Sequence, residues 1–209
     1  MDRIVKTVVW TGIVLAILCG VAFIFLEPFN IPLDDAPLAA SIEPNLHAGD
    51  TVLVTRSSGA TYGHLVRCPD PTPGRDRWMV GRVVGTSGQT FNITNERVTR
   101  SFGQEPTRSC DTPTYAVRNP ANGIVENLRC LAEEVGRTTP TLYGNDSAPS
   151  KRAYTVENGR VFIISDNRHF PNDSTVLGQV NPDTCQTIVL RLWSKSGWGD
   201  SKNRLTVLY

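Results

Sequence analysis

Apolar positions are continuous at the start of the chain and come in short runs between turn residues afterwards. Residues 7–26 carry no charge, and as a helix this run would reach about 30 Å, the thickness of a bilayer core. Arg3 and Lys6 precede the run and acidic residues follow it, a distribution that keeps the N-terminus on the cytoplasmic side of a membrane. The pattern predicts one transmembrane helix, with everything after residue 27 on the outer face.

A cleaved signal peptide is the alternative interpretation of this run. The run is longer than the usual apolar core of a signal peptide, and Leu26 and Glu27 do not form a small-residue cleavage site. We therefore expect a retained single-pass anchor in the cytoplasmic membrane, with residues 1–6 inside and the folded part on the periplasmic or extracellular face. Residues 27–38 contain three prolines, and we expect a short, stiff connector without helix.

Short β-strands are predicted through residues 39–209, which we expect to form one mainly β domain. Apolar runs bounded by turn residues predict strands at 51–54, 64–69, 78–88 and 187–193, and hairpins at 91–99, turning at 94–96, and at 154–164, turning at 157–159. Residues 101–153 are polar and contain prolines. This segment is predicted to be an insertion with short strands and too few apolar residues for a core of its own.

Composition narrows the possible partners. The formal net charge of +1 is close to neutral, which argues against nucleic acid as the main partner. The chain has three histidines, and no two of its five cysteines have the spacing of metal ligands, so we expect neither a metal nor another cofactor.

Four of the five cysteines lie after the apolar run, where an oxidising compartment favours disulfides over free thiols. Four cysteines allow three connectivities. We favour Cys110–Cys130, because this bond closes the insertion, and it leaves Cys68–Cys185 as the second bond. Four free thiols are the alternative.

Ser41 is the main candidate for chemistry. Small residues at 39–40 allow a tight turn before it, Pro44 stiffens the chain after it, and 49–50 is a turn signal that leads into a strand. Ser41 is therefore predicted on a stiff loop that leads into a sheet. A serine hydroxyl needs a base beside it to act as a nucleophile at neutral pH. An isolated Ser-x-x-Pro is usually only a turn, so other parts of the chain must decide.

Three further blocks follow in order, Gly-Arg-Val-Val-Gly-Thr-Ser-Gly at 81–88, Ser-Asp-Asn-Arg at 165–168 and Asn-Asp-Ser at 172–174. Together with the apolar N-terminal run and Ser-Ile-Glu-Pro at 41–44, their order and spacing resemble type I signal peptidases, membrane-bound serine proteases that use a Ser–Lys dyad. The resemblance covers most of the chain except 101–153. It implies strongly bent antiparallel sheets that form an all-β catalytic domain. Such a domain cleaves exported pre-proteins after small side chains at the membrane surface.

The resemblance also implies roles for single residues. Ser41 is the nucleophile, and its own amide helps to form the oxyanion hole. Asp166 and Arg168 are implied as a structural pair beneath the site, with Asp173 and Ser174 as further supports. The full set of expected supports is Arg82, Asp166, Asn167, Arg168, Asp173 and Ser174. The implied partners are the signal peptides of pre-proteins and membrane lipid.

The chain departs from the family pattern at the base. The lysine that serves the family as general base falls on Gly81, a serine near that lysine falls on Pro171, and a second oxyanion donor falls on Ala39. Arg82 cannot replace the lysine because a guanidinium stays protonated. His169 is the best local substitute on chemistry, since its pKa suits base catalysis. A solvated loop histidine is the alternative for His169.

Three functions follow from these features: a signal-peptide endopeptidase on the outer face of the membrane, a non-catalytic relative that binds extended peptides at a strand edge, and an enzyme that processes one dedicated substrate with a different base. Ser41 favours the two enzymes, whereas Gly81, Pro171 and Ala39 favour the binding protein. A lysine introduced at residue 81 is expected to leave its strand on the face opposite Arg82 and, once desolvated, to supply a base.

Overall fold

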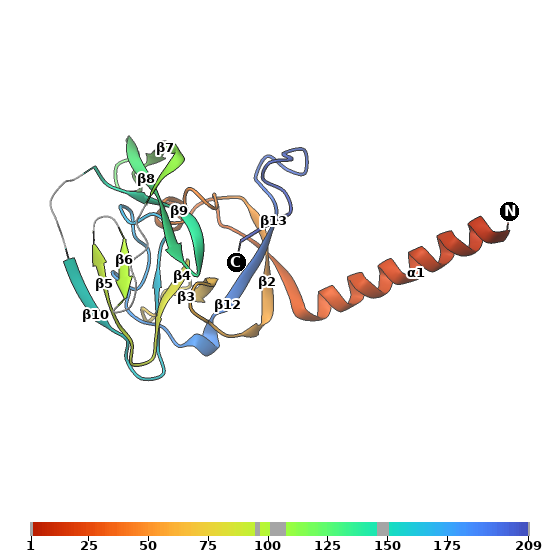
Figure 1. The fold of residues 1–209 in the computed structure, drawn as a ribbon, viewed down its shortest axis with the longest axis horizontal. Helices are drawn as coiled ribbons and strands as arrows, with labels where there is room; N and C mark the ends of the chain where they lie inside the picture. The colour runs from red at the N-terminus through yellow and green to blue at the C-terminus, as the bar shows by residue number, and fades with distance from the viewer. Residues whose placement is uncertain (1, 95–96, 101–107, 146–150, 209) are drawn as a thin grey trace.

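A long helix at the N-terminus projects from a β-rich body in the computed structural model of the chain (Figure 1). The structure describes residues 2–94, 97–100, 108–145 and 151–208, without the side chains of 2, 4, 15, 17–19, 21–23 and 100. The middle of the turn predicted at 94–96 lies outside these residues, as do 101–107 and 146–150 of the predicted insertion.

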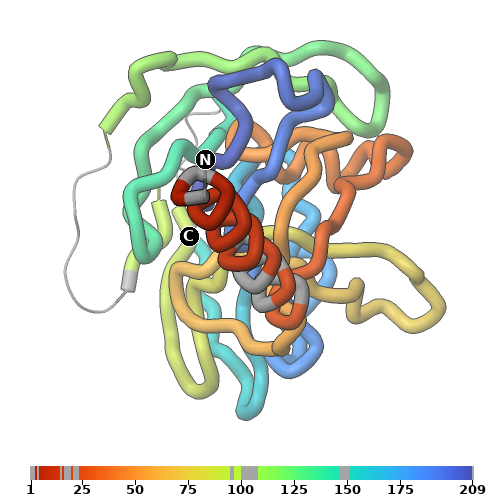
Figure 2. The backbone as a smooth tube through the Cα atoms, turned by 90° about the vertical axis from the view of Figure 1, so that its right-hand side faces the viewer, coloured from red at the N-terminus to blue at the C-terminus, as the bar shows by residue number. Residues whose placement is uncertain are grey.

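Helix α1 (Asp2–Phe25) covers almost all of the uncharged run, so the prediction of a helix there is confirmed. Figure 2 looks at the face of the body from which α1 projects. The described apolar side chains of α1 are exposed, Val8 and Trp10 among them. In the part of the chain that the structure describes, no helix is both long and apolar enough to cross a membrane.

The main sheet is antiparallel and has the strand order β1-β2-β12-β3-β4-β11, with β13 joined to β12. Its strands are β1 (Leu26–Asn30), β2 (Thr51–Ser58), β3 (Leu65–Pro69), β4 (Trp78–Thr86), β11 (Val161–Ile164), β12 (Gln186–Trp193) and β13 (Thr206–Val207). Strand β12 pairs with both β2 and β3, and its pairing with β2 contains three register shifts. Such irregularities bend a strand locally. The prediction of a mainly β fold with antiparallel sheets is confirmed.

The predicted hairpin at 154–164 is wrong. Strand β10 (Lys151–Thr155) instead joins β5 (Thr90–Thr94) and β6 (Val98–Arg100) in a second sheet, while β11 pairs with β4. Strand β11 is the last strand of the main sheet, and all four of its residues are buried, unlike those of an exposed hairpin.

The predicted insertion contains a third sheet, formed by β7 (Arg108–Arg118), β8 (Val125–Val135) and β9 (Arg137–Tyr143). Two of its strands have 11 residues, so the expectation of short strands is wrong. Its apolar cluster of Val117, Leu128, Cys130 and Leu142 includes Ala40 from the main body. The third sheet therefore shares its core with the segment next to Ser41.

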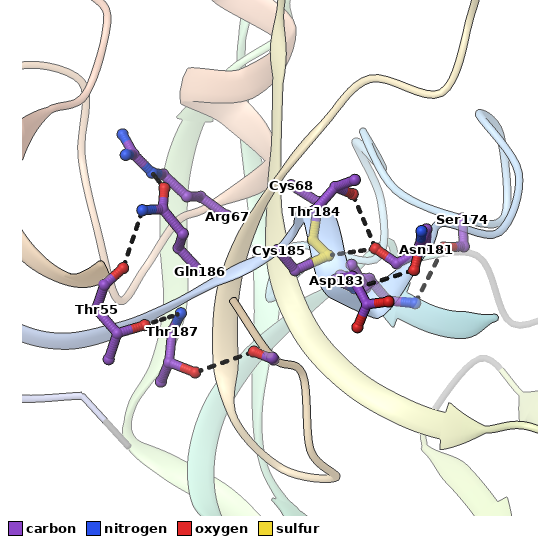
Figure 3. The surroundings of a disulfide bond; sticks show 12 residues. Thr55, Arg67, Cys68, Ser174, Asn181, Asp183, Thr184, Cys185, Gln186 and Thr187 are labelled. Atoms are coloured by element: carbon purple, nitrogen blue, oxygen red, sulfur yellow. Dashed lines mark hydrogen bonds between the residues drawn. A yellow bond between two sulfur atoms is a disulfide. The ribbon is translucent and has the colours of Figure 1, made fainter. Parts of the chain in front are cut away.

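Both predicted disulfides are present. Cys110–Cys130 joins β7 to β8, and Cys68–Cys185 joins β3 to the residue before β12 across a sequence separation of 117 residues. Figure 3 shows the second bond beside Gln186, whose side chain binds Arg67 at 2.8 Å and the main-chain oxygen of Thr55 at 2.9 Å. The disulfide follows η1 (Pro182–Thr184), a single 3-10 turn. Covalent and polar contacts thus hold β2, β3 and β12 together.

The connector before Ser41 is not free of helix, contrary to expectation. Residues 36–41 form α2 (Ala36–Ser41), and the side chain of Asp35 caps it by accepting a hydrogen bond from the amide of Leu38 at 3.1 Å. A capping aspartate followed by a proline in the first turn is a common helix start signal. The sequence interpretation considered only the prolines of the segment and missed this signal.

Candidate active site

Ser41 is the last residue of α2 and not part of a loop, which corrects the prediction for its local structure. Its side chain is fully buried, and its Oγ donates a hydrogen bond to the main-chain oxygen of Leu38 at 2.9 Å. Leu38 is buried in the main core with Val80 of β4, which anchors the helix. The hydroxyl of Ser41 therefore points back towards α2, and its proton is bound by the main-chain oxygen of Leu38.

Asn167 binds the main chain on both sides of the Ala40–Ser41 peptide bond. The main-chain amide of Asn167 donates a hydrogen bond to the main-chain oxygen of Ser41 at 2.9 Å, and its side-chain Nδ2 donates one to the main-chain oxygen of Ala40 at 2.8 Å. Its Oδ1 accepts from the amide of His169 at 3.0 Å, so the side chain is satisfied at both ends. Asn167 is fully buried. The block at 165–168 and the block at 41–44, far apart in sequence, thus meet at Ser41.

Arg82 and Asp166 form a buried ion pair next to this contact. Nε of Arg82 lies 3.0 Å from Oδ1 of Asp166, and both side chains are only 3% exposed. The pairing follows from the register of β4 and β11, which sets Ile164 opposite Arg82 and so brings Asp166 close by. Oδ2 of Asp166 accepts a further bond from Asn45 at 2.8 Å.

The expected pairing of Asp166 with Arg168 is therefore wrong. Arg168 binds Glu133 of β8, with 2.8 Å between Nη2 and Oε2. Glu133 lies in a polar segment without a motif, and the sequence interpretation missed it. Asn45 was missed too, although it directly follows Ser-Ile-Glu-Pro in the same block.

Asp173 and Ser174 hold the chain between β11 and Asn167. Asp173 accepts a hydrogen bond from the amide of Ser165 at 2.6 Å, and the hydroxyl of Ser174 accepts one from the amide of Ile163 at 3.0 Å. Both residues are buried. Their contacts fit the supporting role implied for them, because the segment they hold leads directly to Asn167.

Gly81 fills the position that the family resemblance gives to the catalytic lysine, and the structure leaves no room there for a side chain. A Cβ atom at residue 81 would lie 2.3 Å from the main-chain oxygen of Ile164 and 2.9 Å from Cγ2 of Ile163. Both contacts are with β11, the strand paired with β4. The expectation that a lysine at 81 could be accommodated as a base is wrong, because the main chain of β11 occupies the space.

His169 is bound to an acid and not to Ser41. Its Nε2 lies 3.0 Å from Oε2 of Glu126, which also accepts a hydrogen bond from Asn119 at 2.7 Å. The hydrogen bonds from Asn119 and His169 lower the pKa of Glu126. Among the described residues, no hydrogen bond links His169 with Ser41. The assignment of His169 as the base stays a prediction.

Asp50 fixes the turn that follows Ser41. It is fully buried, and its Oδ2 accepts from the amide of His47 at 3.0 Å and from Nη1 of Arg191 at 3.3 Å. Burial alone would raise the pKa of Asp50, but hydrogen bonds from His47 and the charge of Arg191 outweigh it and lower the pKa. Burial raises the pKa of Glu43, against the opposing charges of His47 and Lys195.

Comparison with known protein families gives a match over most of the chain. The family model described as signal peptidase, peptidase S26, matches residues 4–193. The matched region includes Ser41, Gly81 and the blocks at 165–168 and 172–174. A comparison with curated proteins finds no match.

Proposed function

The chain belongs to the signal peptidase family, peptidase S26, and we propose that it is a membrane-anchored serine endopeptidase that removes signal peptides from exported pre-proteins. One observation carries the proposal beyond family membership. Asn167 binds the main chain at Ser41 and Ala40 across up to 127 residues of sequence. Two blocks that resemble the family's catalytic motifs therefore converge on one serine, which supports Ser41 as the nucleophile.

In the proposed reaction, the Ser41 hydroxyl leaves its hydrogen bond with Leu38 and attacks the scissile carbonyl carbon, while its proton passes to a base. The acyl-enzyme forms as the peptide nitrogen leaves with a proton, and water then releases the acyl group. His169 is the proposed base. Glu126, 3.0 Å from its Nε2, would stabilise the imidazolium ion. The end of α2 must open for this step, because Ser41 is buried.

The proposal includes the membrane. Residues 7–26 would be the single anchor, with residues 1–6 inside and the β domain on the outer face. Three observations support this topology: the uncharged run, the projection of α1 away from the body in Figure 1, and two disulfides of a kind that persists in oxidising compartments. Protease added to intact spheroplasts should digest the domain, whereas full protection of residues 40–209 would refute the topology.

A second candidate function is peptide binding without cleavage. It is favoured by the packing of β11 against Gly81, which leaves no room for the family's base, and by the hydrogen bond that occupies the Ser41 hydroxyl. Such a protein would hold pre-proteins or extended peptides and release them intact.

The test uses the full chain in lipid vesicles with a pre-protein that carries a signal peptide. Mass spectrometry should detect cleavage at the signal-peptide junction by the wild type and none by Ser41→Ala. Equal cleavage by both proteins would overturn the role of Ser41. Binding without cleavage by both proteins would select the second candidate function. Loss of cleavage in His169→Gln, with Ser41 still in place, would support His169 as the base.

A further inference from the structure

Glu133 on β8 is a buried carboxylate with partners on three separate elements. Its side chain is 3% exposed. Oε2 accepts from the hydroxyl of Tyr143 on β9 at 3.0 Å and from Nη2 of Arg168 at 2.8 Å, while Oε1 accepts from the amide of Val98 on β6. A single carboxylate thus connects the second sheet, the third sheet and the segment that contains Asn167.

Arg168 forms its ion pair with Glu133. The guanidinium is buried, its Nη2 binds Glu133, and its Nε and Nη1 have no hydrogen-bond partner among the described residues. Burial raises the pKa of the Tyr143 hydroxyl, as does the neighbouring charge of Glu133, so Tyr143 stays a neutral donor. Glu133 is therefore the hydrogen-bonded ionic partner of a buried cation, on which Asp166 and Asp173 act only through their charges.

Main-chain hydrogen bonds connect the segment that contains Arg168 with Leu142 and with Ser41. The amide of Arg168 donates to the oxygen of Leu142 at 2.8 Å, and the amide of Leu142 donates to the oxygen of Asp166 at 2.9 Å. Asn167 lies between these two attachment points, and its own amide groups bind Ala40 and Ser41. The orientation of Asn167 is thus fixed from the side of the third sheet.

We propose that Glu133 is a positioning residue for Ser41, acting through Arg168 and Asn167. The carboxylate holds Arg168 inside the protein, which keeps Asn167 aimed at the main chain of α2. Without the carboxylate, the guanidinium loses its ion-pair partner, and a turn of Arg168 towards water would displace the neighbouring Asn167. The inference rests on the proposed function only where it treats Ser41 as the nucleophile.

The experiment measures hydrogen exchange in the full chain, which reports on positioning whether or not the protein cleaves peptides. Glu133→Gln should raise the exchange rate of the Asn167 amide about tenfold or more, because its bond to Ser41 opens more often. The amide of Val161, bonded to Val180 on the far side of β11, serves as internal reference. Glu134→Gln, which removes the same charge from the exposed neighbour on β8, should change neither rate.

Glu133→Gln can also unfold the protein, since it removes the ion-pair partner of the buried Arg168. The double variant Glu133→Gln with Arg168→Met removes both charges and keeps an acceptor for Val98. With a positioning role, the Asn167 amide still exchanges faster in the double variant while the Val161 amide returns to its parent rate. Return of both amides to parent rates would overturn the proposal, because Glu133 would then contribute stability alone.

A second readout separates this inference from the proposed function. If the wild type reacts with a fluorophosphonate at Ser41, the double variant should react about a hundredfold more slowly, as expected for a misplaced nucleophile. An unreactive wild type would count against the proposed function, and hydrogen exchange would still decide the role of Glu133. An unchanged Asn167 exchange rate in a folded Glu133→Gln variant would refute the positioning role.

Discussion

A Cβ atom at Gly81 would lie 2.3 Å from the main-chain oxygen of Ile164. The absence of a lysine at this position therefore involves the packing of the sheet as well as one side chain. The paired strand β11 occupies the space that a side chain at residue 81 would need. Any base that serves Ser41 must come from elsewhere, and a single substitution at residue 81 cannot supply it.

Substitutions of Gly81 should destabilise the fold. Gly81→Ala is expected to lower the free energy of unfolding by about 1–3 kcal/mol through overpacking against β11, and Gly81→Lys by more. Denaturant titration of the full chain measures the loss. Gly199→Ala is the matched control, since no atom lies within 4 Å of its Cβ position. A Gly81→Lys variant as stable as the parent, with faster cleavage, would contradict the packing argument.

Asn167→Asp should destabilise the fold, although the two side chains are almost the same size. The change removes the donor to the oxygen of Ala40 and sets a carboxylate against that oxygen in a buried position. A loss of about 1–3 kcal/mol in unfolding free energy is expected. Asn145→Asp is the control. It removes a hydrogen bond of the same length, 2.8 Å from Nδ2 to the main-chain oxygen of Asn127, but at an exposed position. Equal effects of both changes would argue against a special role for Asn167.

The buried pair of Arg82 and Asp166 should be sensitive to loss of one partner. Asp166→Asn leaves Arg82 buried without a counter-charge, and we expect a destabilisation of about 3–5 kcal/mol. Arg75→Gln, at a 3.9 Å ion pair whose arginine is 56% exposed, should cost less than about 1 kcal/mol. Thermal unfolding of both variants tests the contrast, and similar melting temperatures would contradict it.

Asp50 should make stability depend on acid pH. Its pKa is lowered in the folded state, so the charged carboxylate contributes stability above its unfolded pKa of about 3.9. That contribution is lost as the pH falls through the lower, folded pKa. The parent should therefore lose more stability than Asp50→Asn below about pH 4. Parallel curves for the two proteins would show that Asp50 does not titrate in this way.

The sequence predicted those parts of the fold that depend on local pattern. Apolar runs located β2, β4 and β12. The even number of cysteines after the apolar run predicted two disulfides, and the choice of the bond that closes the insertion gave the correct pairing. The sequence did not predict the pairing of β10 with β5. The turn signal at 157–159 suggests a hairpin, but it does not determine which strands the flanking segments pair with. Partners far apart in sequence decide such a choice.

In the candidate site, too, local motifs could be predicted from the sequence and contacts between distant residues could not. The blocks around Ser41 and Asn167 were identified from their residues, because motifs are local. Glu133 could not be found from the sequence, since its role depends on a contact with Arg168 across 35 residues and its own segment shows no motif. The pairing of Asp166 with Arg82 also required the register of β4 and β11.

The chemical reactivity of Ser41 shows whether this residue is the nucleophile. The full chain in lipid vesicles is treated with a fluorophosphonate, digested and mapped by mass spectrometry, with Ser41→Ala in parallel. We expect one adduct on the peptide that contains Ser41 and none in the variant. An unlabelled wild type, or an adduct on another serine that persists in Ser41→Ala, would rule out Ser41 as the nucleophile.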